Sequence, residues 1–277
     1  MKALVNKIIP FSLVDGEGNR FSVFLQGCNF HCLYCHNPET INLCIGCGAC
    51  IDKCPVGALK KDEKIWYDKN KCIDCDECIK GCIHKSTPKT LELSVDEILE
   101  QIEEVRPFLS GITISGGECT LQRDFILELA KRVKTMGLTL FIDTNGYIPI
   151  WKDKELLDNI DKVMLDVKSF DREEHIKLTQ KPNDSVLENL KILLEKKKIY
   201  EVRTVIVPDL LDNENNVKNI SRIIGNIDKN VRYKLIKYRS LGVRRDKLKS
   251  YTPEDEYMKK LMDMAKMNGC NNVISSL

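Results

Sequence analysis

Three cysteines in the segment CNFHCLYC, Cys28, Cys32 and Cys35, have the close spacing of ligands that wrap one iron–sulfur cluster. A four-iron cubane is usually held by four cysteine thiolates. The segment therefore leaves one iron without a ligand of its own. Either a distant cysteine supplies that ligand, or the fourth iron stays open for a substrate or cofactor. A closed cluster stores electrons, whereas an open iron can bind a molecule and transform it.

The chain has thirteen cysteines, and eleven of them lie between Cys28 and Cys82. The N-terminal residues lack the apolar run of a signal peptide, and no segment reaches about 18 uninterrupted apolar residues. We therefore expect a cytoplasmic protein without a membrane partner, whose thiols stay reduced. Cysteines clustered in this way indicate metal binding. The balance of 43 basic and 41 acidic residues argues against a nucleic-acid surface.

Residues 44–85 contain an internal repeat, CIGCGACIDKCP and CIDCDECIKGCI, separated by 28 residues. Its spacing is typical of bacterial ferredoxins, in which three cysteines of a run bind one cubane and the fourth binds the other. Zinc is the alternative, but zinc sites usually show separated pairs of cysteines. We expect a ferredoxin-like insert with two closed 4Fe–4S clusters, one on Cys44, Cys47, Cys50 and Cys82, and one on Cys72, Cys75, Cys78 and Cys54.

Strands and helices alternate in the rest of the chain, which predicts an α/β fold with a parallel sheet. Strands are expected at 19–27, 111–118, 138–146, 162–168, 200–208 and 231–239. Helices are expected at 94–105, 123–137, 154–160, 184–198, 216–227 and 253–269. Six units are too few for a closed eight-stranded barrel. We expect a partial (β/α)6 barrel formed by 1–43 and 86–277, with the insert at 44–85. A flat, doubly wound sheet is the alternative.

Glycine and polar motifs follow these strands where each strand ends. In parallel α/β folds this rim is where active sites are built. Cys119 and Cys270 are the remaining candidates for a fourth ligand, but nothing around either resembles a cluster loop. We expect Cys119 to be a small core residue, and we expect His84 and His175 at the surface. The rim motifs are Cys28 to Cys35, Ser115 to Glu118, Asp143 to Gly146, and Asp166 to Lys168.

The spacing C-x-x-x-C-x-aromatic-C, with Tyr34 as the aromatic residue, resembles the signature of the radical S-adenosylmethionine (SAM) enzymes. In that family SAM chelates the open iron. The segments VDGEGNRFSVFLQGCNFHCLYCHNP, ITISGGE, FIDTNG and VMLDVK, in this order, resemble the glycyl radical enzyme activating enzymes. The resemblance covers nearly the whole chain outside the insert. KIIPFSLVDG and the insert resemble especially the YjjW-type subgroup.

The resemblance implies roles for single residues of this chain. The segment that would contact the adenine of SAM is Tyr34, Cys35 and His36. The motif that would pair with the SAM amino group is Gly116, Gly117 and Glu118. Two further SAM contacts would be Asp166 and Lys168, and Arg203 matches an arginine of the fifth strand. A monovalent-cation site is implied for Asp143 and Thr144 with Met164. Asp15 resembles a residue near the partner's glycyl loop.

Two departures from the family pattern affect these expectations. Cys119 stands where the family often has a proline. Arg239 stands where many relatives have a histidine that contacts SAM, so this contact is a weaker expectation.

The implied enzyme holds three 4Fe–4S clusters and cleaves SAM reductively to methionine and a 5′-deoxyadenosyl radical. The radical takes hydrogen from a glycine Cα of a glycyl radical enzyme, and a flavodoxin- or ferredoxin-type protein supplies the electron. The insert could relay electrons, which we favour, or dock a partner. Two other functions stay open: a radical SAM enzyme acting on a small molecule or another peptide, and a non-catalytic ferredoxin-type electron carrier.

Overall fold

All six predicted strands are present and belong to one sheet. The structure is a computed structural model that describes residues 1–243 and 248–275. The sheet has nine strands in the order β11-β10-β9-β8-β7-β6-β2-β1-β5. Its strands are β1 Lys2–Ser12, β2 Arg20–Leu25, β5 Leu91–Ser94, β6 Gly111–Gly116, β7 Thr139–Thr144, β8 Lys162–Asp166, β9 Ile199–Ile206, β10 Arg232–Lys237 and β11 Asn272–Ser275.

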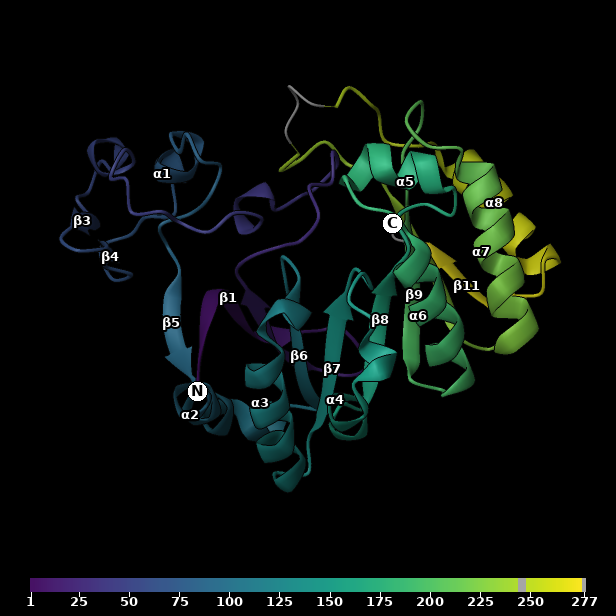
Figure 1. Ribbon diagram of the computed structural model, residues 1–277, viewed down its shortest axis with the longest axis horizontal. Coiled ribbons are helices and arrows are strands. Elements are labelled where there is room, and N and C mark those ends of the chain that lie inside the picture. The colour runs from purple at the N-terminus through teal and green to yellow at the C-terminus, as the bar shows by residue number, and fades with distance from the viewer. Residues whose placement is uncertain (244–247, 276–277) are drawn as a thin grey trace.

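The strand order distinguishes a partial barrel from a doubly wound sheet. From β2 to β11 all pairings are parallel, and the order follows the chain without reversal. A doubly wound sheet reverses its order at a switch point, so the flat alternative is wrong. Right-handed crossovers of this kind place the helices on one face. The helices 95–105, 123–135 and 154–159 contact one another in turn along the outside of the sheet, as do the helices 184–195, 213–227 and 255–267 (Figure 1). The strands β5 and β11 are the two edge strands of the sheet. Among the described residues no pairing joins one of them to the other.

The six predicted helices are also present, and the structure adds elements that the sequence did not suggest. The strand β1 was missed because two register shifts interrupt its pairing with β2, which blurs the alternation of buried residues. The strands β5 and β11 are only four residues long each. The helices are α1 Glu77–Lys80, α2 Val95–Val105, α3 Arg123–Thr135, α4 Lys154–Asn159, α5 Arg172–Thr179, α6 Asp184–Glu195, α7 Asn213–Ile227 and α8 Asp255–Met267.

Residues 44–85 form a small unit beside the sheet, on the left in Figure 1. It contains a hairpin, β3 Leu59–Lys61 and β4 Ile65–Tyr67, and its own small core. The chain enters and leaves this unit side by side, through a bridge between Asn42 and Ser86. The Ser86 hydroxyl donates to the Asn42 carbonyl oxygen at 2.6 Å, and buried Gln26 donates to the same oxygen at 2.8 Å. These bonds fasten the unit to the end of β2.

Two glycines let β6 end against the backbone of β2. A Cβ on Gly116 would lie 2.1 Å from the Leu25 carbonyl oxygen, and one on Gly117 would lie 2.3 Å from that of Gly27. The Gly117 N–H donates to the Leu25 oxygen at 3.0 Å. The resemblance assigned these glycines to SAM. The structure gives them a second purpose, because only glycine permits this contact with the segment that leads into the Cys28 loop.

Replacing Gly117 by alanine tests this contact. We expect Gly117→Ala to lower the free energy of unfolding by about 1–3 kcal/mol, the usual cost of overpacking. We also expect less iron after anaerobic reconstitution, because the Gly27 carbonyl must move and Cys28 follows it. Gly137→Ala is the control: its φ of +72° makes alanine unfavourable, but its surroundings are open. Denaturant unfolding measures the stability of each variant, and elemental analysis measures its iron content. Equal iron contents in the two variants would contradict the prediction.

Candidate functional site

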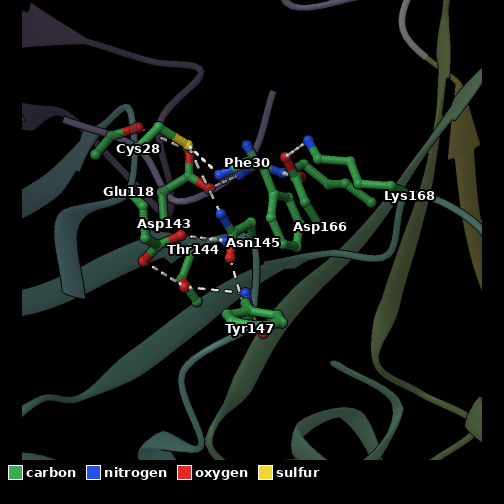
Figure 2. A network of polar contacts seen from close by, with 12 residues as sticks. Cys28, Phe30, Glu118, Asp143, Thr144, Asn145, Tyr147, Asp166 and Lys168 are labelled. Carbon is green, nitrogen blue, oxygen red and sulfur yellow. Dashed lines mark hydrogen bonds and ion pairs between the residues drawn. The ribbon is translucent and has the colours of Figure 1, made fainter. Parts of the chain in front are cut away.

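The motifs that follow β2, β6, β7 and β8 meet at the rim formed by the carboxyl ends of these strands, as predicted. The Ser115 hydroxyl donates to Asp143 at 3.0 Å, which links the ends of β6 and β7. The Asn145 amide donates to Asn29 Oδ1 at 2.8 Å, which links β7 to the cysteine loop. Figure 2 shows Asp143 and Asn145 close to Cys28 and Glu118 at this rim.

Helix α5 accepts backbone hydrogen bonds from the loop with Cys28, Cys32 and Cys35. The backbone N–H groups of His31 and Leu33 donate to the carbonyl oxygens of Thr179 and Leu178, at 3.0 and 3.1 Å. The Phe30 ring packs edge-on against two other rings, those of Tyr147 and His175. The loop is therefore fixed by backbone hydrogen bonds and by a buried aromatic contact.

The predicted surface position of His175 is wrong. The residue is fully buried because its ring supports Phe30 and its Nδ1 faces the Lys181 carbonyl oxygen at 2.7 Å. Burial lowers the pKa of His175, which favours the neutral ring. It supports the cysteine loop from the α5 side.

Cys32 is buried, and Cys28 and Cys35 are half-buried. Burial raises the pKa of Cys28 and of Cys32 to about 12 each. Such thiols become thiolates when a strong positive charge, such as cluster iron, lies beside them. All thirteen cysteines are described, and none forms a disulfide.

No group of three or more His, Cys, Asp or Glu in the described chain converges on a single ion. A cubane, by contrast, spreads its ligands over four irons. Cys119 is buried, as expected, and its Sγ donates to the Asp143 carbonyl oxygen at 3.2 Å. Cys270 donates to the Ser221 carbonyl oxygen at 3.4 Å. Both candidates for a distant fourth ligand therefore have backbone partners.

The side chain of Glu118 links the segments at the ends of β6 and β7 by hydrogen bonds. Its Oε1 accepts hydrogen bonds from the Thr120 N–H, the Thr120 hydroxyl and the Thr144 hydroxyl, at 3.1, 2.6 and 2.7 Å. Its Oε2 accepts from the Asn145 N–H at 2.8 Å. Burial raises the pKa of Glu118, and these donors oppose that effect. The carboxylate is used within the protein, so its contribution to a ligand site is indirect.

Four charged side chains form a network over the ends of β7, β8 and β9. Arg203 contacts the carboxylate of Asp143 and donates to Asp166 Oδ1 at 2.9 Å. Lys168 lies 2.6 Å from Asp166 Oδ2. Burial disfavours the charged form of Lys168, but Asp166 together with neighbouring groups outweighs burial and holds the pKa of Lys168 well above its usual value. All four residues were predicted for the site, and the structure brings them together.

The remaining residues predicted at SAM lie around this network. Tyr34 is buried, its ring lies 5.8 Å from the Lys168 ammonium, and its phenol oxygen has no hydrogen-bond partner among the described residues. His36 and Arg239 are exposed at the rim. Burial, with the charges of Lys168 and Arg239, lowers the pKa of His36, so these three residues lie near one another.

The side chains expected around a monovalent cation have protein partners. Asp143 contacts Arg203 and accepts from Ser115, while the Thr144 hydroxyl donates to Glu118. Met164 is fully buried. The cation stays a prediction from the resemblance, and in this structure the Arg203 guanidinium supplies the positive charge beside Asp143.

Asp15 is on the loop between β1 and β2, and its negative charge favours the charged form of Arg203 in this network. Its carboxylate accepts from the hydroxyls of Ser12 and Ser22, at 2.6 and 3.0 Å. Its carbonyl oxygen accepts from the Thr113 hydroxyl in β6 at 2.6 Å. Two exposed apolar residues, Leu13 and Val14, precede it on the loop. Asp15 is therefore held in place on a loop that is partly open to contact.

The unit formed by 44–85 contains two hollows. Each is lined by four cysteines, and in each case three come from one run and one from the other. One hollow has Cys54, Cys72, Cys75 and Cys78. The other has Cys44, Cys47, Cys50 and Cys82. These are the two crossed sets expected from the repeat.

The two cysteine runs reach the same left-handed backbone conformation with different residues. Gly46 and Gly48 in the first run have positive φ, and the equivalent residues of the second run are Asp74 and Asp76, with φ of 51° and 59°. A left-handed aspartate costs more than a glycine. Lys89 lies within reach of both carboxylates, 3.3 and 2.7 Å away, and lines the same hollow. This contact offsets part of the backbone strain and places a cation beside one set of cysteines.

Sequence reasoning missed Asn145 and Asn29. Asn145 is buried, and its amide nitrogen lies 3.9 Å from Cys28 Sγ as well as 2.8 Å from Asn29 Oδ1 (Figure 2). Both residues lie inside the quoted motifs. Their polar side chains next to a metal-binding cysteine and at a strand end were the available signal.

Comparison with known proteins gives the same assignment. Residues 22–220 match the Radical SAM superfamily. The (2S)-3-sulfopropanediol sulfolyase activating enzyme of Bilophila wadsworthia is 31% identical, over 95% of this chain and 96% of that protein. The trans-4-hydroxy-L-proline dehydratase activating enzyme of Clostridioides difficile is 33% identical, over 78% of this chain and 77% of that protein.

Among solved structures, a domain of a pyruvate-formate lyase-activating enzyme from Bacteroides vulgatus is similar in fold. Its TM-score is 0.53 at 21% identity, and the match covers 61% of this chain and 100% of that domain. No described helix is long and apolar enough to span a bilayer. The cysteine loop, the rim at the strand ends and these similarities agree, and the chain belongs to the glycyl radical enzyme activating enzymes of the Radical SAM superfamily.

Proposed function

We propose that this chain activates a glycyl radical enzyme, with a 4Fe–4S cluster on Cys28, Cys32 and Cys35 and SAM bound at the open iron. The observation that carries the proposal is the meeting of this cysteine loop with the charged network at one rim. The relatives named above, each activating a glycyl radical enzyme, support the same reaction class.

When bound, the cluster and SAM supply the one-electron chemistry that yields methionine and a 5′-deoxyadenosyl radical. The chain's own residues bind and orient SAM. The segment of Tyr34, Cys35 and His36 would meet the adenine. Lys168 and Arg203 offer donors to a carboxylate, and Asp166 offers acceptors to hydroxyl groups. Backbone groups of Gly116, Gly117 and Glu118 would receive the amino group, and Arg239 would add a further SAM contact.

The partner-binding proposal rests on the loop between β1 and β2. Leu13 and Val14 present apolar side chains to solvent, and Asp15 beside them has a fixed carboxylate. A glycine-bearing loop of a partner enzyme would contact this surface. A barrel that is open between β5 and β11 gives a partner segment more access than a closed barrel would. A cytoplasmic location, where the cysteines stay reduced, remains our expectation.

We also propose that residues 44–85 form a ferredoxin-like domain with two further 4Fe–4S clusters. The two hollows, each lined by one crossed set of four cysteines, support it. The domain would pass single electrons from a flavodoxin- or ferredoxin-type reductant toward the Cys28 loop. Its attachment to the end of β2 through Asn42, Ser86 and Gln26 supports a relay. These features are those expected of the subgroup with a two-cluster insert.

The first prediction concerns SAM cleavage. After anaerobic reconstitution and reduction with dithionite, we expect the protein to produce 5′-deoxyadenosine from SAM. Cys32→Ala should reduce this product to background, because the cluster loses a ligand. Cys270→Ala, which removes a buried cysteine far along the chain, should keep the activity. Chromatography of the nucleoside measures both. A fully loaded, reduced protein that makes no product would favour the electron-carrier function instead.

The second prediction concerns the insert. We expect the double variant Cys75→Ala with Cys78→Ala to lose about a third of the iron and sulfide, the share of one cluster in three. Cys47→Ala with Cys50→Ala should lose the same share from the other hollow. Both variants should keep the cluster at Cys28. Elemental analysis that finds zinc in place of this iron would contradict the proposal.

The third prediction concerns the partner. Incubation with SAM, a one-electron reductant and a glycyl radical enzyme from the same genome should give the EPR doublet of a glycyl radical. The signal should vanish with Cys32→Ala and when the target glycine of the partner is replaced by alanine. SAM cleavage without any radical on such partners would point to a small molecule or another peptide as the substrate.

A further inference from the structure

Asn145 lies between a buried carboxylate and the first cysteine of the loop. Its backbone N–H donates to Glu118 Oε2 at 2.8 Å, and its Oδ1 accepts from the Tyr147 N–H at 3.0 Å. Its Nδ2 lies 2.8 Å from Asn29 Oδ1 and 3.9 Å from Cys28 Sγ. Figure 2 shows this side chain in the middle of the polar network. Every polar group of Asn145 that points into the rim has a partner.

These partners decide which way the amide faces. A flipped amide would place its oxygen against Asn29 Oδ1 and its nitrogen against the Tyr147 N–H, which are two repulsive contacts. The nitrogen must therefore face Asn29 and Cys28. Because an amide nitrogen carries two hydrogens, one can bond Asn29 while the other is directed toward the sulfur. Glu118 adds to this by holding the backbone of Asn145.

The Cys28 sulfur also accepts a second hydrogen bond. The Phe30 N–H lies 3.4 Å from it, within the same loop. That donor is a backbone N–H group, which a change of side chain leaves in place. The longer contact comes from the side-chain amide of Asn145, and a substitution can remove it. Hydrogen bonds to cluster sulfur stabilise the reduced, more negative cluster, and they therefore raise its reduction potential.

We propose that Asn145 is a positioning residue for the iron–sulfur site. It anchors the loop at Asn29, and its amide donates to Cys28 Sγ, which raises the reduction potential of the cluster there. The inference rests on the proposed cluster at Cys28, Cys32 and Cys35. It gives the T-N-G segment after β7 a function separate from SAM binding, and it connects Glu118 to the cluster through Asn145.

The test is an EPR-monitored redox titration of the reconstituted full chain, without SAM. The signal of the Cys28 cluster is the part of the spectrum that Cys32→Ala loses, which separates it from the insert clusters. Asn145→Ser removes the donor without adding bulk. Asn189→Ser is the matched control. Asn189 is buried and bonds the carbonyl oxygens of Gly146 and Ile148 in the same segment, at 2.7 and 2.8 Å. It contacts no cysteine in the described residues.

We expect Asn145→Ser to shift the potential of this cluster to a more negative value. At a solution potential that half reduces the natural protein, well under half of the variant's cluster should be reduced. Asn145→Asp should shift it further, since a carboxylate would repel the reduced cluster. Asn189→Ser should be less stable to denaturant but should keep the natural potential. This order separates an electrostatic role from a merely structural one.

The measured potentials and cluster contents of the variants decide the proposal. The expected order of potentials, or loss of the Cys28 cluster from Asn145→Ser while Asn189→Ser keeps it, supports a specific role. Equal potentials in the natural protein and Asn145→Ser would overturn it, as would equal shifts in the Asn145 and Asn189 variants. If Cys32→Ala loses no iron, the proposed function fails instead, because no cluster is then held at this loop.

Discussion

The buried carboxylate of Glu118 is the contact on which the whole rim depends. A buried carboxylate is stable only when hydrogen bonds replace the water it has lost. Two of the four donors are backbone N–H groups, which cannot turn into acceptors, and this favours the ionised form. They come from Thr120 and Asn145, at the ends of β6 and β7. Glu118 therefore fixes the distance between two strand ends on which the other side chains of the site are built.

The same rim is connected to the cysteine loop by backbone geometry. The Glu118 N–H donates to the Gly27 carbonyl oxygen at 2.8 Å, next to Cys28. Gly116 and Gly117 make this approach possible, since any Cβ would collide with β2. Hydrogen bonds thus connect the loop, β6 and β7 to one another. A site that must hold a reactive radical near one hydrogen atom gains from such connections, because small displacements cost much rate.

Charge balance at the rim suggests how it receives a ligand. Arg203 and Lys168 pair with Asp143 and Asp166, and Arg203 also lies 4.0 Å from the buried carboxylate of Glu201, so cations and anions are paired in a poorly hydrated place. A zwitterionic ligand with an amino and a carboxylate group can exchange these pairs without leaving a net buried charge. In the insert, by contrast, Lys89 with Asp74 and Asp76 distinguishes one hollow from the other. The two proposed insert clusters therefore have unequal electrostatic surroundings.

The sequence by itself determined the pattern of ligands and the succession of strands. Cysteine spacing is local, so the loop at Cys28 and the repeat at 44–85 could be recognised without any fold. The six parallel strands followed from apolar runs and the motifs at their ends. Short strands such as β5 and β11, and the irregular β1, were missed because edge pairing leaves little trace in the residues. His175 was misplaced because its burial depends on Phe30, far away in the chain.

Only the tertiary structure decided which polar side chains serve the ligand and which serve the protein. Glu118 belonged to a motif expected at SAM, but its carboxylate is used to hold β7. Asn145 stood unremarked between two motif residues, yet it reaches the cysteine loop. The physical reason is that a hydrogen bond depends on the positions of two atoms at once. Spacing along the chain fixes those positions within a loop, and across strands only packing does.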